Sequence, residues 1–119
     1  MKKRLLSIAM LCLVLMFAVV PVVSATTPAI GFDEKKTIWY TDGVVSYEFT
    51  APESKLYTFS LGKLLPVQMT QTLNVYDDQN QLLGNSVSYG IAKIYLNLTA
   101  GQVVRIDAST TFKAGLVVY

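Results

Sequence analysis

The feature that most constrains the fold is a strict alternation of apolar and polar residues in short segments. In segment 44–51, Val45, Tyr47 and Phe49 alternate with polar residues. The same alternation is found in three later segments, 55–61, 91–98 and 103–108. Successive side chains of a strand point to opposite faces of a sheet, so the apolar residues of each segment gather on one face. Each segment is therefore predicted to be a strand with one buried face.

Turn-forming residues separate these segments at short intervals. Further strands are predicted at 37–40, 72–77, 82–90 and 115–119. Glycines interrupt segment 82–90, which predicts an edge strand or a bent strand. After residue 25, no segment shows the sustained 3.6-residue period of an amphipathic helix. Seven to eight short strands with frequent turns predict an all-β domain, built as an antiparallel sandwich or barrel.

The N-terminal segment is predicted to be a helical secretory signal peptide. Lys2, Lys3 and Arg4 precede a long apolar run, and the run ends in small residues before a cleavage site after Ala25. The alternative is an uncleaved membrane anchor, since the run approaches the length that a spanning helix needs. Pro21 argues against the anchor because proline breaks a helix. The predicted organisation is a signal peptide at 1–25, an N-terminal extension at 26–36 and a β-sandwich domain at 37–119, secreted from the cell.

The charge balance and the missing residue types limit the function after cleavage. Three of the ten basic residues lie within residues 1–25, so seven basic residues remain against eight acidic ones, a net charge of −1. This balance argues against nucleic acid and against an anionic membrane as partners. The chain has no histidine, and its one cysteine, Cys12, lies in the signal peptide. Histidine-dependent nucleophilic catalysis and nearly all zinc sites are thereby excluded, and no enzyme activity is expected.

Two turns share one sequence design. Phe49, Thr50, Ala51 and Pro52 correspond in order to Leu98, Thr99, Ala100 and Gly101, and an alternating strand is predicted on each side of both turns. Proline presets φ near the value that a turn needs, and glycine can adopt a positive φ. Each turn is predicted to close a hairpin. The two hairpins are either a symmetric pair that faces the two sheets of a jelly roll or two unrelated hairpins.

Four segments together resemble a known family, the bacterial pre-peptidase C-terminal domain and its jelly-roll relatives. They read "YEFTAPESKLYTFSL", "LNVYDDQNQLLG", "IYLNLTAGQVVRI" and "AGLVVY", and the resemblance covers residues 44–119. Asn80 stands where the family has glycine, and Val104 where it has tyrosine. The resemblance implies an antiparallel β-sandwich of jelly-roll type. It also implies a non-catalytic role beside a secreted hydrolase, here as an accessory subunit acting in trans.

Some relatives in the resembled family bind calcium, which directs attention to Asp77 and Asp78. These carboxylates, with Gln79 and Gln81, imitate the alternate spacing of a calcium loop. Glutamine is a weak ligand and the closing bidentate glutamate is missing. A solvated turn is therefore predicted here, with calcium as the alternative and no other cofactor.

Exposed aromatic side chains are the remaining candidates for ligand contact. Tyr76 and Tyr95 fall on the opposite face from the apolar residues of their strands, and Trp39 and Tyr40 lie at the edge of the domain. Such rings can stack on sugars or on peptide, although core packing is the alternative for each. We expect a secreted, non-catalytic binding module that contacts extracellular polysaccharide or a secreted or surface protein. A structural role, with exposed strand edges pairing with a partner's sheet, is the alternative.

Overall fold

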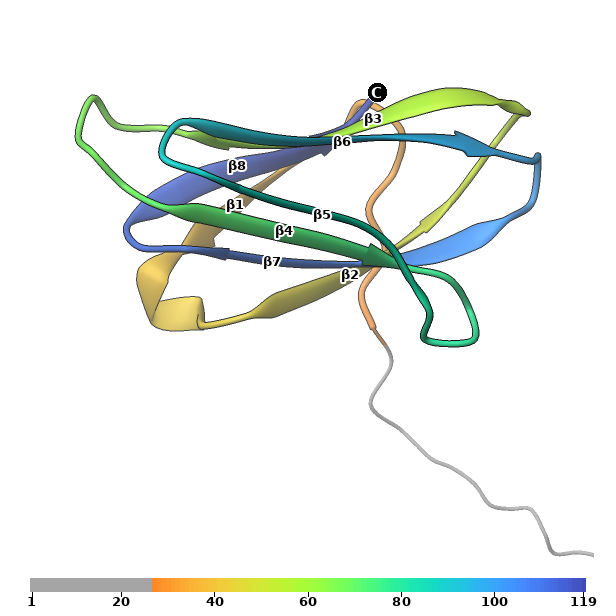
Figure 1. Ribbon diagram of the computed structural model, residues 1–119, viewed down its shortest axis with the longest axis horizontal. Helices are drawn as coiled ribbons and strands as arrows, with labels where there is room; N and C mark the ends of the chain where they lie inside the picture. Colours follow the sequence, from red (N-terminus) through yellow and green to blue (C-terminus); the bar gives the residue numbers. More distant parts are fainter. Residues whose placement is uncertain (1–26) are drawn as a thin grey trace, which may run out of the picture.

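In the computed structural model, which describes residues 27–119, the alternating segments form two facing β-sheets (Figure 1). The strands are β1 (Lys35–Trp39), β2 (Val45–Thr50), β3 (Lys55–Lys63), β4 (Gln71–Tyr76), β5 (Leu82–Ser88), β6 (Ile91–Leu98), β7 (Val103–Thr110) and β8 (Lys113–Val118). A 3₁₀-helix, η2 (Tyr40–Asp42), lies between β1 and β2. The predicted signal peptide and its cleavage site after Ala25 lie outside the described residues.

The strand order is that of an eight-stranded jelly roll. The first sheet has the order β1-β8-β3-β6, the second has β2-β7-β4-β5, and every strand pair is antiparallel. The chain changes sheet at every connection except the one between β4 and β5. The predicted all-β sandwich of jelly-roll type is confirmed. The expectation that segment 82–90 is an edge strand is also confirmed, because β5 ends the second sheet.

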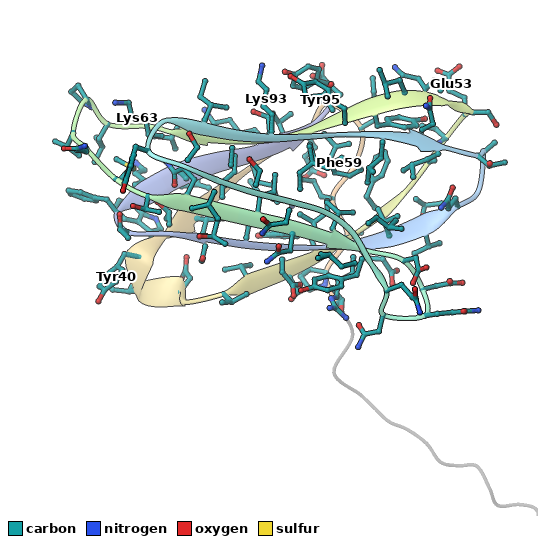
Figure 2. All side chains as sticks on the ribbon, viewed as in Figure 1. Tyr40, Glu53, Phe59, Lys63, Lys93 and Tyr95 are labelled. Carbon is teal, nitrogen blue, oxygen red and sulfur yellow. The ribbon has the colours of Figure 1, made fainter. Side chains whose placement is uncertain are left out.

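Three aromatic residues form the centre of the core between the sheets. Phe49, Tyr57 and Phe59 are each at most 1% exposed, and Phe49 packs edge-to-face against both of the others. Figure 2 shows Phe59 between the two layers. The Tyr57 hydroxyl donates to the Glu53 carbonyl at 2.6 Å, so the polar end of this buried side chain is satisfied. The period-two alternation thus places the side chains that hold the two sheets together.

The residues before β1 belong to the sandwich, which corrects the predicted boundary at residue 37. Ile30 is 2% exposed and packs in the core, and its backbone N–H donates to the Glu48 carbonyl at 3.0 Å. Glu34 accepts from the Gly31 N–H and pairs with Lys36, and both contacts hold the pKa of its carboxyl below the ordinary value. A single buried isoleucine has no periodicity, so the sequence pattern does not reveal this segment's contribution.

The prediction that the turns at Pro52 and Gly101 close hairpins is wrong, because each turn joins strands of different sheets. β2 and β3 lie in opposite sheets, as do β6 and β7. We call each of these turns, which connect one sheet to the other, an arch. The two arches are hydrogen-bonded to each other: the Gly101 N–H donates to the Ala51 carbonyl at 2.8 Å, and the Ala51 N–H donates to the Gln102 carbonyl at 2.9 Å. The shared sequence design therefore marks a symmetric pair that connects the sheets, which was one of the two readings of these turns.

Gly101 is the sensitive residue of the second arch. The Gln102 N–H donates to the Thr99 carbonyl and Gly101 has φ of 86°, as in a type II turn. A Cβ at Gly101 would meet no atom within 4 Å, so Gly101→Ala tests backbone strain alone. We expect this change to lower the free energy of unfolding by about 1 kcal/mol, measured by urea denaturation.

Gly90 supplies the matched control for that measurement. A Cβ there would also meet no atom within 4 Å, but its φ is not positive. Gly90→Ala should therefore leave the free energy of unfolding unchanged or raise it slightly. If Gly90→Ala and Gly101→Ala lower the free energy of unfolding equally, the cost at Gly101 does not come from its positive φ.

Candidate binding site

Three exposed aromatic rings surround a cleft at one end of the sandwich. The cleft has a volume of about 300 Å³ and is lined by Trp39, Tyr40, Thr41, Thr111 and Phe112. The aromatic side chains are 45%, 65% and 45% exposed at Trp39, Tyr40 and Phe112 respectively. Figure 2 shows Tyr40 on the short helix at this end. We call this feature the aromatic cleft.

Backbone contacts join the two segments that form the aromatic cleft. The Tyr40 N–H donates to the Phe112 carbonyl at 2.7 Å, which ties η2 to the turn between β7 and β8. The Trp39 N–H donates to Asp42 Oδ2 at 2.8 Å, so a carboxylate caps the short helix. Gly43, with φ of 66°, closes the helix through its N–H bond to the Tyr40 carbonyl. The rings are therefore carried by a backbone fixed on both sides.

A lysine lies against the tryptophan at the margin of the cleft. Trp39 and Lys113 are cross-strand partners in β1 and β8, and the Lys113 Nζ lies 4.5 Å from the centre of the indole ring. This is cation–π geometry, which orients the indole and leaves a positive charge beside the cleft. The aromatic cleft thus combines ring faces for stacking, the hydroxyls of Thr41 and Thr111, and one cation.

The four aromatic residues proposed from the sequence do not form one site. Trp39 and Tyr40 come together, while Tyr76 is half-buried under Arg105, whose guanidinium carbon lies 4.4 Å from the ring centre. Tyr95 is 59% exposed on the outer face of β6, away from the cleft (Figure 2). Phe112 was missed because only the antiparallel pairing of β1 and β8 brings it to η2; no local pattern marks it.

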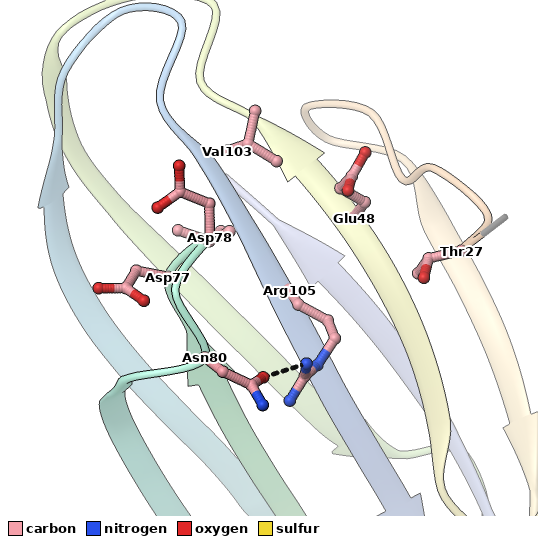
Figure 3. A pocket seen from close by; sticks show the side chains of 8 residues that line it. Thr27, Glu48, Asp77, Asp78, Asn80, Val103 and Arg105 are labelled. Atoms are coloured by element: carbon pink, nitrogen blue, oxygen red, sulfur yellow. Dashed lines mark hydrogen bonds between the residues drawn. The ribbon is translucent and has the colours of Figure 1, made fainter. Parts of the chain in front are cut away.

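A second hollow, of about 290 Å³, is polar and lies beside the turn that follows β4 (Figure 3). Its lining residues are Thr27, Glu48, Asp77, Asp78, Asn80, Val103, Val104 and Arg105. Arg105 donates to the Asn80 side chain and forms an ion pair with Asp107 at 3.1 Å. Asn80 has φ of 65°, so asparagine holds the left-handed conformation at the position where the resembled family has glycine. The arginine of this hollow is therefore already held by internal partners.

Asp77 stabilises the turn in which it lies. Asp77 Oδ1 already accepts the N–H groups of Gln79 and Gln81, at 2.8 and 2.9 Å, as a turn-forming aspartate does. Within residues 27–119, no three histidine, cysteine or acidic side chains cluster closely enough to hold a metal ion. The same part of the chain contains no helix long and apolar enough to cross a membrane.

Comparisons with known proteins bear on the fold. No protein-family model matches the chain, and no curated protein matches it significantly in sequence. Among solved structures, it is similar to the pre-peptidase C-terminal domain of a collagenase from Bacillus anthracis, with a TM-score of 0.63 and 14% sequence identity. The match covers 83% of this chain and 100% of that domain. The resemblance inferred from four sequence segments is thereby confirmed at the level of the fold.

Proposed function

We propose that the protein is an exported, non-catalytic binding module that contacts extracellular polysaccharide through the aromatic cleft. One observation carries the proposal: exposed rings from two distant segments, at Trp39, Tyr40 and Phe112, converge on one cleft with a fixed backbone. Large apolar rings rarely gather on a protein surface without a binding role. The basic start, apolar run and small residues before position 26 support export.

The chemistry of the cleft suits a sugar. An aromatic ring packs against the apolar face of a pyranose, while hydroxyl groups at the rim bond to the sugar's own hydroxyls. Thr41 and Thr111 supply those hydroxyls. Glycoside hydrolysis uses a pair of aspartate or glutamate side chains beside the scissile bond, and the residues that line this cleft include neither. Binding without cleavage is the activity that this cleft supports best.

A second candidate is an accessory role toward a secreted protease. It is favoured by the structural similarity to a domain that, in its own protein, is part of a collagenase. In that case the aromatic cleft would contact protein, either the protease acting in trans or its substrate. Apolar clefts rimmed by polar groups serve peptides as well as sugars, so the ligand decides between the two candidates.

Tyr40→Ala should weaken retention on insoluble polysaccharide about tenfold, because stacking of one ring is worth about 0.5–1.5 kcal/mol beyond the area that it buries. Retention is measured by co-sedimentation with cellulose, chitin and purified bacterial cell wall. Tyr89→Ala is the matched control, since Tyr89 is 69% exposed but lies in the turn between β5 and β6, outside the cleft. Both variants should keep the wild-type melting temperature.

Two results would reject this proposal. If Tyr40→Ala and Tyr89→Ala bind the polymers equally well, the aromatic cleft is not the contact site. If wild-type protein is retained by none of the three polymers but is captured by an immobilised secreted protease, the second candidate replaces the first.

A further inference from the structure

The charges of the sandwich are divided between its two sheets. All six lysines that follow residue 26 lie in strands of the first sheet: Lys35 and Lys36 in β1, Lys55 and Lys63 in β3, Lys93 in β6 and Lys113 in β8. These four strands contain no acidic residue. The strands of the second sheet carry Glu48, Arg105 and Asp107, and Asp77 and Asp78 follow β4. The strands of the first sheet therefore carry only positive charge, although the chain after residue 25 has a net charge of −1.

Two of the lysines occupy opposite ends of one row across the outer face of the first sheet. The register runs from Lys35 to Val117, from Val117 to Ser60 and from Ser60 to Lys93. Three strand spacings separate the two backbones by about 14 Å. Lys93 projects outward between the buried residues Ala92 and Ile94, and Figure 2 shows it pointing away from the interior. Both ammonium groups are therefore presented on the same side of the sheet.

The stem of Lys35 lies along this face and does not extend freely into solvent. A Cβ added at Gly115 would be 2.9 Å from Lys35 Cε, so the side chain crosses the sheet directly above the glycine. Long lysine stems that pack on a sheet keep the charged end at the surface and limit its motion. The Lys35 side chain thus lies over the outer face of the first sheet, next to β8.

Two tyrosines form a second row beside the lysines. Thr58 pairs with Tyr95 on one side, and it exchanges backbone hydrogen bonds of 2.6 and 2.9 Å with Tyr119 on the other. Tyr95 and Tyr119 are 59% and 41% exposed. Two strand spacings place their backbones about 10 Å apart, with only a threonine between them. This separation is close to the repeat of two sugar rings in an extended glycan.

The lysines of this face have no acidic partner in the described part of the chain. Between residues 27 and 119 the ion pairs are Lys36 with Glu34 and Arg105 with Asp107. Lys35 and Lys93 take part in neither, and Lys113 lies over the Trp39 ring. We call the outward surface formed by Lys35, Lys93, Lys113, Tyr95 and Tyr119 the lysine face. It offers cations and aromatic rings together.

We propose that the lysine face binds an acidic polysaccharide, whose chain lies across the sheet with sugar rings on Tyr95 and Tyr119 and carboxylates on Lys35 and Lys93. This inference rests on the proposed function, which gives polysaccharide as the class of ligand. It adds that the polysaccharide is negatively charged. Trp39 and Lys113 join the lysine face to the aromatic cleft, so one chain can contact both. Three lysines are few for the closely spaced phosphates of DNA, and their separation suits the wider spacing of charged sugars.

The test is affinity electrophoresis of the full secreted protein in gels that contain polygalacturonate or, as the neutral polymer, dextran. Wild-type protein should be retarded by polygalacturonate at least tenfold more strongly than by dextran. Retardation should weaken as salt rises, because ions screen exposed charges. Lys35→Gln/Lys93→Gln should lose at least tenfold of the affinity for polygalacturonate, and Tyr95→Ala severalfold.

The matched control removes the same charge from the same sheet. In Lys36→Gln/Lys55→Gln, one lost lysine pairs with Glu34 and the other lies over the rings of Phe32 and Tyr57. This variant should keep at least half of the wild-type affinity. If both double variants lose the same affinity for polygalacturonate, the attraction depends on total charge and not on the lysine face, and the inference is overturned.

Other outcomes separate this inference from the proposed function. Equal, salt-independent retardation by both polymers would overturn the acidic ligand and leave a polysaccharide-binding module. Binding to DNA or to phosphatidylglycerol vesicles as strong as to polygalacturonate would overturn it in favour of a general anion surface. Retardation by neither polymer, together with no retention on the insoluble polymers, would reject the proposed function itself.

Discussion

Replacing Phe59 by alanine is expected to lower the free energy of unfolding by about 3–5 kcal/mol. The side chain is fully buried and its ring meets Phe49 edge-to-face, with 5.9 Å between the ring centres. Its removal leaves a cavity between the two sheets that the surrounding strands can fill only in part. A domain of this size has a total stability of about 5–15 kcal/mol, so the variant should be partly unfolded at elevated temperature.

Urea denaturation followed by tryptophan fluorescence measures this loss, since Trp39 is the one tryptophan. Phe59→Leu should cost less than Phe59→Ala because it refills much of the volume. Tyr95→Ala removes a ring of similar size from the outer face of the neighbouring strand, and it should cost within about 0.5 kcal/mol. Comparable losses for Phe59→Ala and Tyr95→Ala would mean that the alternation does not separate core from surface.

The alternation in the sequence predicts the inward face of most strands because the period of two is a local property. Each side chain's direction follows from its neighbours alone, so Tyr57 and Phe59 could be placed in the core without knowledge of the topology. The edge position of β5 could be predicted for a similar reason, because glycines within a strand weaken that strand and are visible in its own sequence.

Sheet membership, by contrast, could not be predicted from local pattern. The segment 99–102 has the turn chemistry of a hairpin, yet it connects β6 of one sheet to β7 of the other. A turn of a given type fixes the direction of the chain over a few residues. It does not specify whether the next strand hydrogen-bonds to the last one or packs against it, because that choice depends on which strands elsewhere already occupy the neighbouring positions.

The same limit applies to the binding surfaces. Trp39 and Tyr40 could be singled out as adjacent aromatics at a domain edge, but Phe112 joins them only through the pairing of β1 with β8. The net charge of −1 argued against nucleic acid and against an anionic membrane as partners. It did not reveal that the lysines share one sheet, since a sum over the chain carries no information about where the strands place each charge.

Gly84→Ala is expected to lower the free energy of unfolding by about 1–3 kcal/mol through overpacking. Gly84 lies in β5 at the bulge where the register to β4 shifts, and it faces β6 of the other sheet. A Cβ there would lie 2.5 Å from Ile94 Cγ2. The contacted methyl is attached to the stiff, branched Cβ of a buried residue, so it cannot rotate away without leaving its preferred rotamer. β5 and β6 would have to separate at the open edge of the sandwich.

A double-mutant cycle with Ile94→Leu identifies the cause. Leucine keeps the volume of isoleucine but carries no methyl on Cβ, so it removes the clash and should cost less than about 1.5 kcal/mol alone. The double variant should then be more stable than the sum of the single changes predicts, by about 0.5 kcal/mol or more. Gly62→Ala is the control, because a Cβ at Gly62 would meet Ile91 at 3.6 Å, an ordinary contact. If the losses from Gly84→Ala and Ile94→Leu simply add, the cost of Gly84→Ala arises in the backbone of the bulge and not from contact between the two sheets.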